Sequence, residues 1–149
     1  MKKIEIDTFL KFRFLSNPHF SPDGTKIAFT VSVPDRETNG YLSDLYLYDL
    51  RKKTVSRVTC AGDAKIWSWT AENTLIFTAA RTASLKKEKE NGTSFFYEIS
   101  PSGGEASCRA SVPASVTGIR LLPDGRYLLT IRHDNYKDTR KKSYEVFDE

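Results

Sequence analysis

HFSPDGTKIAFTVS, residues 19–32, joins a tight turn to an alternating strand. Ser, Pro, Asp and Gly at positions 21–24 match the preferences of a type I turn, in which Pro fixes φ at the second position. Gly24 provides the left-handed conformation that residues with a Cβ resist. Apolar side chains then alternate with more polar ones, the apolar set being Ile27, Phe29 and Val31. This period of two predicts a hairpin whose tip is residues 21–24.

The same turn recurs twice along the chain. LLPDGRYLLTI, residues 121–131, repeats Pro, Asp and Gly before another alternating segment. WTAENTLIFT, residues 69–78, has Trp69 where the first copy has Phe20, and Asn73 where it has Gly24. Asn visits the left-handed region more readily than most residues with a Cβ. Phe20 to Trp69 is 49 positions, and Trp69 to Leu121 is 52. Repeats of roughly 40 to 50 residues are typical of helical arrays or propeller blades.

The segments between the turns have the composition of strands, which favours propeller blades over helical arrays. They are DLYLYDL (44–50), TVSRVT (54–59), SFFYEI (94–99) and EASCRA (105–110). Each unit therefore has four short antiparallel strands, the composition of a β-propeller blade. We predict an all-β partial propeller of about two and a third four-stranded antiparallel blades. Blade 1 is expected at 18–62, blade 2 at 63–113 and the start of blade 3 at 114–149. Residues 1–17 are expected to hold a short N-terminal helix, which Asp7 caps and Pro18 ends.

The length and the charge of the chain limit the classes of function that it could have. Propellers close with typically 4 to 8 blades, so at about 50 residues each the smallest ring needs roughly 200 residues, whereas this chain has 149. The net charge is +4, but the basic stretches 81–92 and 133–142 also contain acids, which favours solvated loops over a docking patch. No phosphate loop or base-stacking signature predicts nucleic-acid binding. No apolar run follows Met1, so we expect no secretory signal, no membrane span and a cytoplasmic protein.

Candidate catalytic and metal residues all have plainer interpretations. No Gly-x-Ser-x-Gly surrounds any serine. His19 and His133 are interpreted as polar strand-end residues rather than bases, and Asp23 and Asp124 as turn residues rather than calcium ligands. We therefore expect no catalytic residue, no metal ligand and no cofactor in this chain. Two further sets are expected to be structural. Cys60 and Cys108 are expected to be reduced and partly buried. Most of a set of aromatics are expected to pack between blades rather than to line a channel, the set being Trp67, Trp69, Tyr46, Tyr48, Phe95 and Phe96.

The sequence also resembles a known family. The segments IDTFLKFRFLSNPHFSPDGTKIAFTVS, DLYLYDL, WSWTAENTLIFTAARTA, FFYEISPSGGEA and KKSYEVFDE resemble the N-terminal propeller of the prolyl oligopeptidase family, particularly its acylaminoacyl-peptidase and dipeptidyl-peptidase branches. The resemblance covers nearly the whole chain. It implies a lid over an α/β-hydrolase domain whose Ser-Asp-His triad cleaves short peptides. No triad member falls within this chain, and Glu37 lacks the adjacent acid that some relatives use to bind a peptide amino terminus.

Two functions from different classes follow. The first is a non-catalytic, substrate-gating propeller portion of a cytoplasmic serine peptidase that cleaves short peptides or acyl-amino acids, with a missing catalytic domain as its partner. The second is a non-enzymatic propeller module, of the TolB or WD kind, for protein–protein interaction. Because an open ring leaves apolar faces without a neighbour, we also expect the chain to self-associate through those faces, to exchange strands at the unfinished third blade, or to be only marginally folded.

Overall fold

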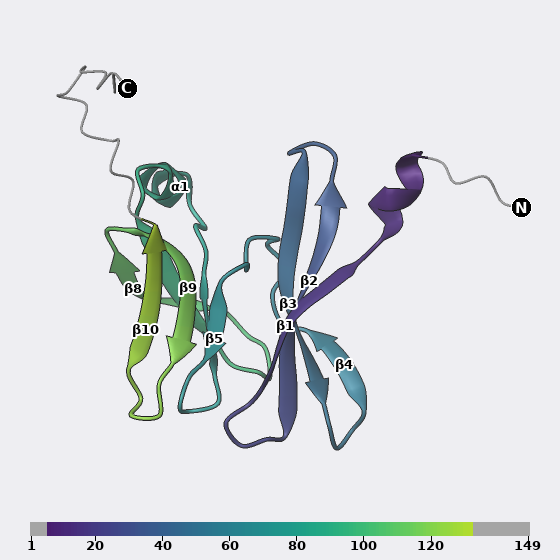
Figure 1. Ribbon diagram of the computed structural model, residues 1–149, viewed down its shortest axis with the longest axis vertical. Helices are drawn as coiled ribbons and strands as arrows, with labels where there is room; N and C mark the ends of the chain where they lie inside the picture. Colours follow the sequence, from purple (N-terminus) through teal and green to yellow (C-terminus); the bar gives the residue numbers. More distant parts are fainter. Residues whose placement is uncertain (1–5, 133–149) are drawn as a thin grey trace, which may run out of the picture.

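The computed structural model describes residues 6–132 and shows three antiparallel sheets (Figure 1). The first has strand order β1 (Phe14–Phe20), β2 (Lys26–Asp35), β3 (Gly40–Asp49), β4 (Thr54–Arg57). The second has the order β5 (Trp67–Trp69), β6 (Leu75–Thr78), β7 (Ser94–Ile99), β8 (Ser107–Val112). The third contains β9 (Ser115–Leu121) and β10 (Tyr127–Arg132). The predicted class, all-β with four-stranded antiparallel sheets, is confirmed.

The three predicted turns are tight hairpins at one end of the molecule (Figure 1). The first closes through a hydrogen bond of 2.8 Å from the Gly24 N–H to the Ser21 carbonyl. φ is positive at Gly24 (67°), Asn73 (59°) and Gly125 (82°), as the repeat predicted. An equivalent cross-strand pair flanks each turn. The pairs are Phe20 with Ile27, Trp69 with Leu75 and Leu121 with Tyr127. These pairs fix the alignment of the three repeats.

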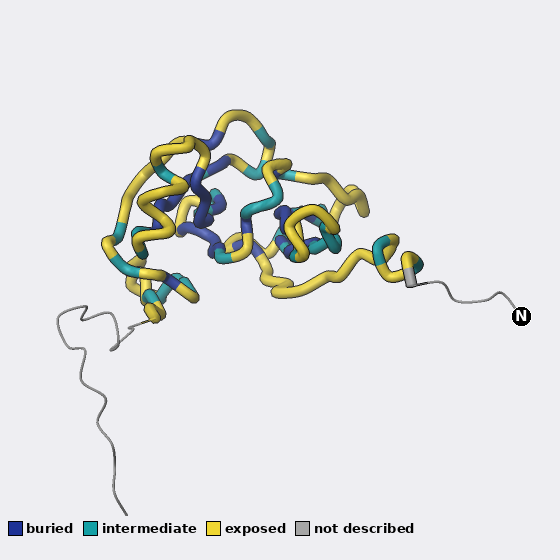
Figure 2. Tube along the Cα trace, turned by 90° about the horizontal axis from the view of Figure 1, so that it is seen from above, coloured by how far each residue is buried: buried dark blue, intermediate teal, exposed yellow. Residues whose placement is uncertain are grey.

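The core lies between the first two sheets. We call the side of β1–β4 that carries Ala28, Thr30, Leu45 and Leu47 the near face. It packs against the second sheet through one cluster, whose members there are Trp67, Trp69, Leu75, Phe77, Phe95, Tyr97 and Ile99. The indole N–H of Trp67 donates a hydrogen bond of 2.9 Å to Thr30 Oγ1. Figure 2 shows the buried residues gathered in the strands of these two sheets, with exposed residues in the loops around them.

The opposite side of the first sheet, the far face, carries Phe20, Ile27, Phe29, Tyr46, Tyr48 and Val55. Phe20 is equivalent to Trp69, yet Trp69 packs against the near face of the first sheet. Equivalent faces of the two sheets therefore point the same way, and opposite faces meet. Repetition by rotation about one axis, as in a propeller, requires this arrangement. Two sheets related as mirror partners in a sandwich would bury equivalent faces instead.

Two helix predictions need correction. The expected helix after Asp7 is a 3-10 helix, η1 (Ile6–Lys11), and β1 begins at Phe14, ahead of the expected start of blade 1. Aromatic contacts explain this, because Phe9 packs on Phe14 and Tyr41 at ring distances of 5.7 and 6.5 Å. The expected loop at 81–92 instead contains α1 (Ala83–Glu90). Its start is capped by Thr82, whose Oγ1 accepts from the Leu85 N–H at 3.2 Å, and Lys87 and Lys89 favour its C-terminal end.

Replacing Gly24 with Val is expected to lower the free energy of unfolding by about 1–3 kcal/mol, the cost of a strained backbone position. A Cβ at Gly24 would meet no atom within 4 Å, so the cost comes from φ alone. Gly40→Val is the matched control, because Gly40 has no positive φ and only ordinary contacts. Urea unfolding checks both variants. Equal effects of the two substitutions would contradict the assigned turn.

Replacing Thr30 with Val removes the acceptor of the buried Trp67 indole, which is expected to cost about 1–3 kcal/mol. In the double variant with Trp67→Phe, the loss should be smaller than the sum of the two single losses, because no indole N–H is then left unpaired. Denaturant unfolding of all four proteins gives the coupling energy. Strict additivity would show that the two sheets are not joined by this contact.

Candidate functional site

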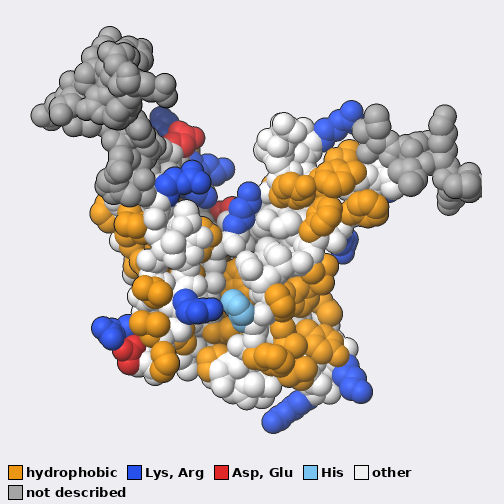
Figure 3. Space-filling view, viewed as in Figure 1, with side chains coloured by type: hydrophobic (Ala, Val, Ile, Leu, Met, Phe, Trp, Pro, Cys, Tyr) orange, Lys and Arg blue, Asp and Glu red, His pale blue; other side chains and the backbone are white. Residues whose placement is uncertain are grey.

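The first strands of the three sheets, β1, β5 and β9, form the candidate site. The indole N–H of Trp69 on β5 donates to the His19 carbonyl on β1 at 3.1 Å, and β5 contacts β9. A hollow of about 350 Å³ lies between these strands, lined by His19, Phe20, Pro22, Ser68, Trp69, Ile119, Arg120 and Leu121. The three equivalent positions of the repeat, Phe20, Trp69 and Leu121, all belong to this lining. Figure 3 shows the surface hollowed on this side, with a histidine in pale blue.

The lining of the hollow combines apolar walls with one basic side chain. Its walls are mainly aromatic and aliphatic, Arg120 adds a positive charge, and neither Asp nor Glu is present in the lining. The Ser68 hydroxyl donates to the Trp69 carbonyl at 3.1 Å. The His19 ring lies 5.5 Å from the Trp67 ring. Within residues 6–132 no hydrogen bond joins His19 to a serine or a carboxylate, which a serine nucleophile would require.

The turn aspartates have the local role that the sequence predicted. Asp23 Oδ1 accepts hydrogen bonds from Ser21 Oγ at 2.6 Å and from the Thr25 N–H at 3.0 Å. These bonds, the Ser21 hydroxyl foremost, lower the pKa of Asp23 from 3.8 to about 2. Asp124 likewise accepts from the Arg126 N–H at 3.1 Å. The Asp23 N–H also donates to Asn73 Oδ1 at 3.0 Å, which joins the turns of the first two sheets.

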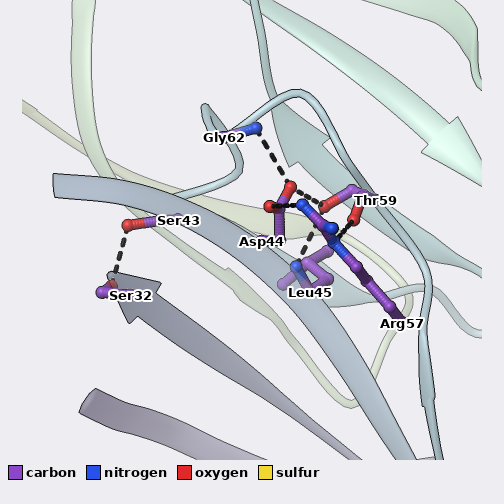
Figure 4. A network of polar contacts seen from close by, with 7 residues as sticks. All are labelled: Ser32, Ser43, Asp44, Leu45, Arg57, Thr59 and Gly62. Carbon is purple, nitrogen blue, oxygen red and sulfur yellow. Dashed lines mark hydrogen bonds and ion pairs between the residues drawn. The ribbon is translucent and has the colours of Figure 1, made fainter. Parts of the chain in front are cut away.

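A buried carboxylate, Asp44 on β3, has an equally structural role (Figure 4). Its Oδ1 accepts from Thr59 Oγ1 at 2.9 Å and from the Gly62 N–H at 3.1 Å, while Oδ2 pairs with Arg57. The hydrogen bond to Asp44 raises the pKa of the Arg57 guanidinium. Thr59 Oγ1 in turn accepts from the Leu45 N–H at 3.0 Å. The network therefore holds the linker between the first two sheets against β3.

The remaining predicted residues do not come together. Cys60 and Cys108 are free, as expected, but exposed rather than partly buried, because Cys60 lies in the linker after β4 and Cys108 lies on β8, the last strand of its sheet. Trp67, Trp69, Phe95 and Phe96 are buried, whereas Tyr46 and Tyr48 lie half-buried on the far face, which agrees with the prediction that most of these six aromatics pack between blades. Glu37 is exposed between β2 and β3, and His133 lies outside the described residues.

The described part of the chain offers neither a cluster of metal ligands nor a helix that could span a membrane. Residues 6–132 contain no group of three His, Cys, Asp or Glu side chains that could hold a metal ion. No helix in that range combines the length and apolar character needed to cross a bilayer.

Replacing Asp23 with Asn is expected to flatten the acid dependence of stability. The pKa of Asp23 is lowered on folding, so its contribution is present above pH 3.8 and is lost as the pH falls to about 2. Ser21→Ala should flatten the same window, because the Ser21 hydroxyl is the main cause of the shift. Thermal midpoints measured across that window check this. An unchanged slope in both variants would contradict the assigned turn geometry.

Comparison with known proteins places the fold. No family model matches the sequence. A Bacillus subtilis protein described as uncharacterized peptidase YuxL is 26% identical over 156 residues, covering 97% of this chain and 22% of that protein. The chain thus spans about a fifth of its curated relative.

Solved structures agree with this comparison. The acylaminoacyl peptidase of Pyrococcus horikoshii has a TM-score of 0.62 at 18% identity, over 87% of this chain and 20% of that one. The β-propeller domain of the trilobed protease from Pyrococcus furiosus has a TM-score of 0.57 at 15% identity, over 81% and 34%. The partial β-propeller is thereby confirmed. In sequence and fold, the chain is similar to a propeller portion of a prolyl oligopeptidase-family peptidase.

Proposed function

We propose that the chain is the non-catalytic, substrate-gating portion of the propeller of a cytoplasmic serine peptidase, which cleaves short peptides or acyl-amino acids. The sheet β1–β4 is one blade, from Phe14 to about residue 62, and β5–β8 is the next, at about 63–113, while β9–β10 begins a third within 114–149. The α/β-hydrolase domain of the longer protein supplies the triad. One observation carries the proposal. We call β1, β5 and β9, the first strands of the three sheets, the inner strands; a hollow without catalytic groups lies on them, in a fold shared with peptidase propellers.

The inner strands explain how such a portion selects substrates. The strands β1, β5 and β9 each contribute residues to one common space, so a peptide that enters this space contacts all three strands. A hollow of about 350 Å³ is at the small end of ligand sites, which suits a few residues of extended peptide rather than a folded domain. Trp69 and Phe20 offer apolar contacts, and Arg120 attracts a carboxylate.

A non-enzymatic interaction module is the second candidate. The observation that favours it is the far face of the first sheet, where Phe20 and Val55 are 64% and 59% exposed. Exposed apolar patches of this kind mark protein interfaces. In that case the far face, rather than the inner hollow, would bind the partner.

The purified chain is expected to show no serine-inhibitor-sensitive turnover of chromogenic acyl-amino acid or dipeptide substrates. Titration with a short N-acetylated peptide is expected to shift NMR signals of His19, Ser68 and Trp69, and to leave those of β4 and β8 unchanged. Arg120→Gln should weaken binding of the free-acid peptide and spare that of its C-terminal amide, the matched control.

Inhibitor-sensitive turnover would place catalysis within this chain and overturn its non-catalytic role. Peptide shifts confined to the outer strands, or no shifts at concentrations that saturate a longer peptidase of this kind, would contradict gating by the inner strands.

A further inference from the structure

A pair of neighbouring cavities lies beside α1, at the end of the molecule opposite the three hairpin turns (Figure 1). Their volumes are about 420 and 310 Å³, and Asp63 and Lys89 line both of them. The walls come from α1, from the linker before β5, from the adjoining ends of β6 and β7, and from β9. We call the pair the α1 cavities. Among the described residues, they share no lining residue with the hollow of the inner strands.

Asp63, in the linker before β5, has one carboxylate oxygen without a partner. Its Oδ2 accepts a hydrogen bond of 3.2 Å from the Ala80 N–H. Its Oδ1 is buried, and within residues 6–132 it is the one buried side-chain oxygen or nitrogen that has no hydrogen-bond partner. Buried polar groups are nearly always paired, and an unpaired carboxylate oxygen is among the costliest exceptions. Asp63 therefore offers a place for a donor that the described residues do not supply.

Three ammonium groups belong to the walls of the same cavities. Lys65 lines the smaller cavity, Lys86 the larger one and Lys89 both. None of these lysines forms an ion pair with an acidic side chain of the described residues. Glu90 is the acid that joins Asp63 in the walls. The α1 cavities thus combine positive and negative groups over a short span of surface.

This combination of charges favours a ligand that carries both signs. A purely anionic ligand would gain from the lysines but would be repelled by Asp63, and a purely cationic ligand would face the reverse. A zwitterion can place its ammonium group on Asp63 and its carboxylate on Lys65 or Lys89, and both contacts are charge-assisted hydrogen bonds. The walls therefore match the two charged groups of an α-amino acid.

The smaller cavity also has an apolar wall and a limited size. Ile66, Phe95 and Val116 line it. Its volume of about 310 Å³ is at the small end of ligand sites. An aliphatic side chain would replace water against this wall, and a longer peptide would not be enclosed. The size and the apolar wall thus favour a single amino acid.

We propose that the α1 cavities bind a free α-amino acid with an aliphatic side chain. Asp63 Oδ1 accepts from its α-ammonium group, Lys65 and Lys89 pair with its α-carboxylate, and its side chain lies against Phe95. Lys89 belongs to α1, which has no buried residue of its own, so the bound amino acid also holds this helix in place. This site is separate from the hollow of the inner strands, and the inference goes beyond the proposed gating role.

Isothermal titration calorimetry with L-leucine tests the site. All residues of its walls lie within 63–116, so the chain contains the groups that the proposal requires. L-Leucine is expected to bind. Isoamylamine lacks the carboxylate of leucine and isocaproate lacks its amine, so each should bind at least tenfold more weakly. Asp63→Asn should weaken leucine binding at least tenfold, because it removes the charge that holds the ammonium group. Lys87→Gln, on α1 but outside both walls, is the matched control and should bind leucine as the unchanged chain does.

NMR titration with the same amino acid locates the site. Leucine should shift the backbone signals of Ala80, whose N–H donates to Asp63, and of Ser94, which lines the smaller cavity. The signals of Trp69 and Arg120, in the hollow of the inner strands, should stay unchanged. Shifts confined to the hollow would refute the α1 cavities as the site and would leave the gating proposal intact.

Three calorimetric results would overturn the proposal. One is no binding at tens of millimolar leucine. Another is equal affinity for isoamylamine or isocaproate, which would show that only one charge is recognised. The last is unchanged affinity in Asp63→Asn, as expected if an ordered water or a lysine satisfies Oδ1. Circular dichroism verifies folding, and if Asp63→Asn unfolds, the exposed Lys65→Gln and Lys89→Gln replace it, with at least threefold weaker binding as the supporting result and unchanged binding as the contrary one.

Discussion

The packing of Trp67 and Trp69 against the first sheet is the contact on which the rest of the structure depends. Both side chains are 5% exposed, and each also donates a hydrogen bond across the gap, to Thr30 and to the His19 carbonyl. An indole combines a large apolar area with one directed donor, so it fixes both distance and orientation. The strand that bears them, β5, has only three residues, and its short ladder alone would hold it weakly.

This orientation determines where the chemistry can occur. Because opposite faces of successive sheets meet, the first strand of every sheet falls on the same side of the molecule, and β1, β5 and β9 share one hollow. Two carboxylates outside the hollow have structural roles: Asp23 stabilises a turn, and Asp44 holds the linker between the first two sheets. Shape, apolar contact and the charge of Arg120 are what the described lining of the hollow offers to a ligand.

The turns were predictable from local chemistry, because the residues Ser-Pro-Asp-Gly determine the backbone conformation of the turn that they form. The alternation of Ile27, Phe29 and Val31 also revealed which residues share a face. It did not reveal which face meets a neighbouring sheet, and so it could not show that Tyr46 and Tyr48 lie half-buried on the far face. The helix α1 was missed because it has no buried residue and hence no apolar period to detect. The hollow was missed because each sheet contributes only a strand end. Its signal was nevertheless present in the repeat, which aligns Phe20, Trp69 and Leu121.

The sense in which the two four-stranded sheets stack is the central claim, and proton–proton nuclear Overhauser effects from the two indoles test it most directly. The structure predicts contacts from the Trp67 and Trp69 rings to Ala28, Leu45 and Leu47, all on the near face. Contacts from the same rings to Phe29 and Tyr46 would contradict it, because the sheets would then bury equivalent faces, as a sandwich does and a propeller does not.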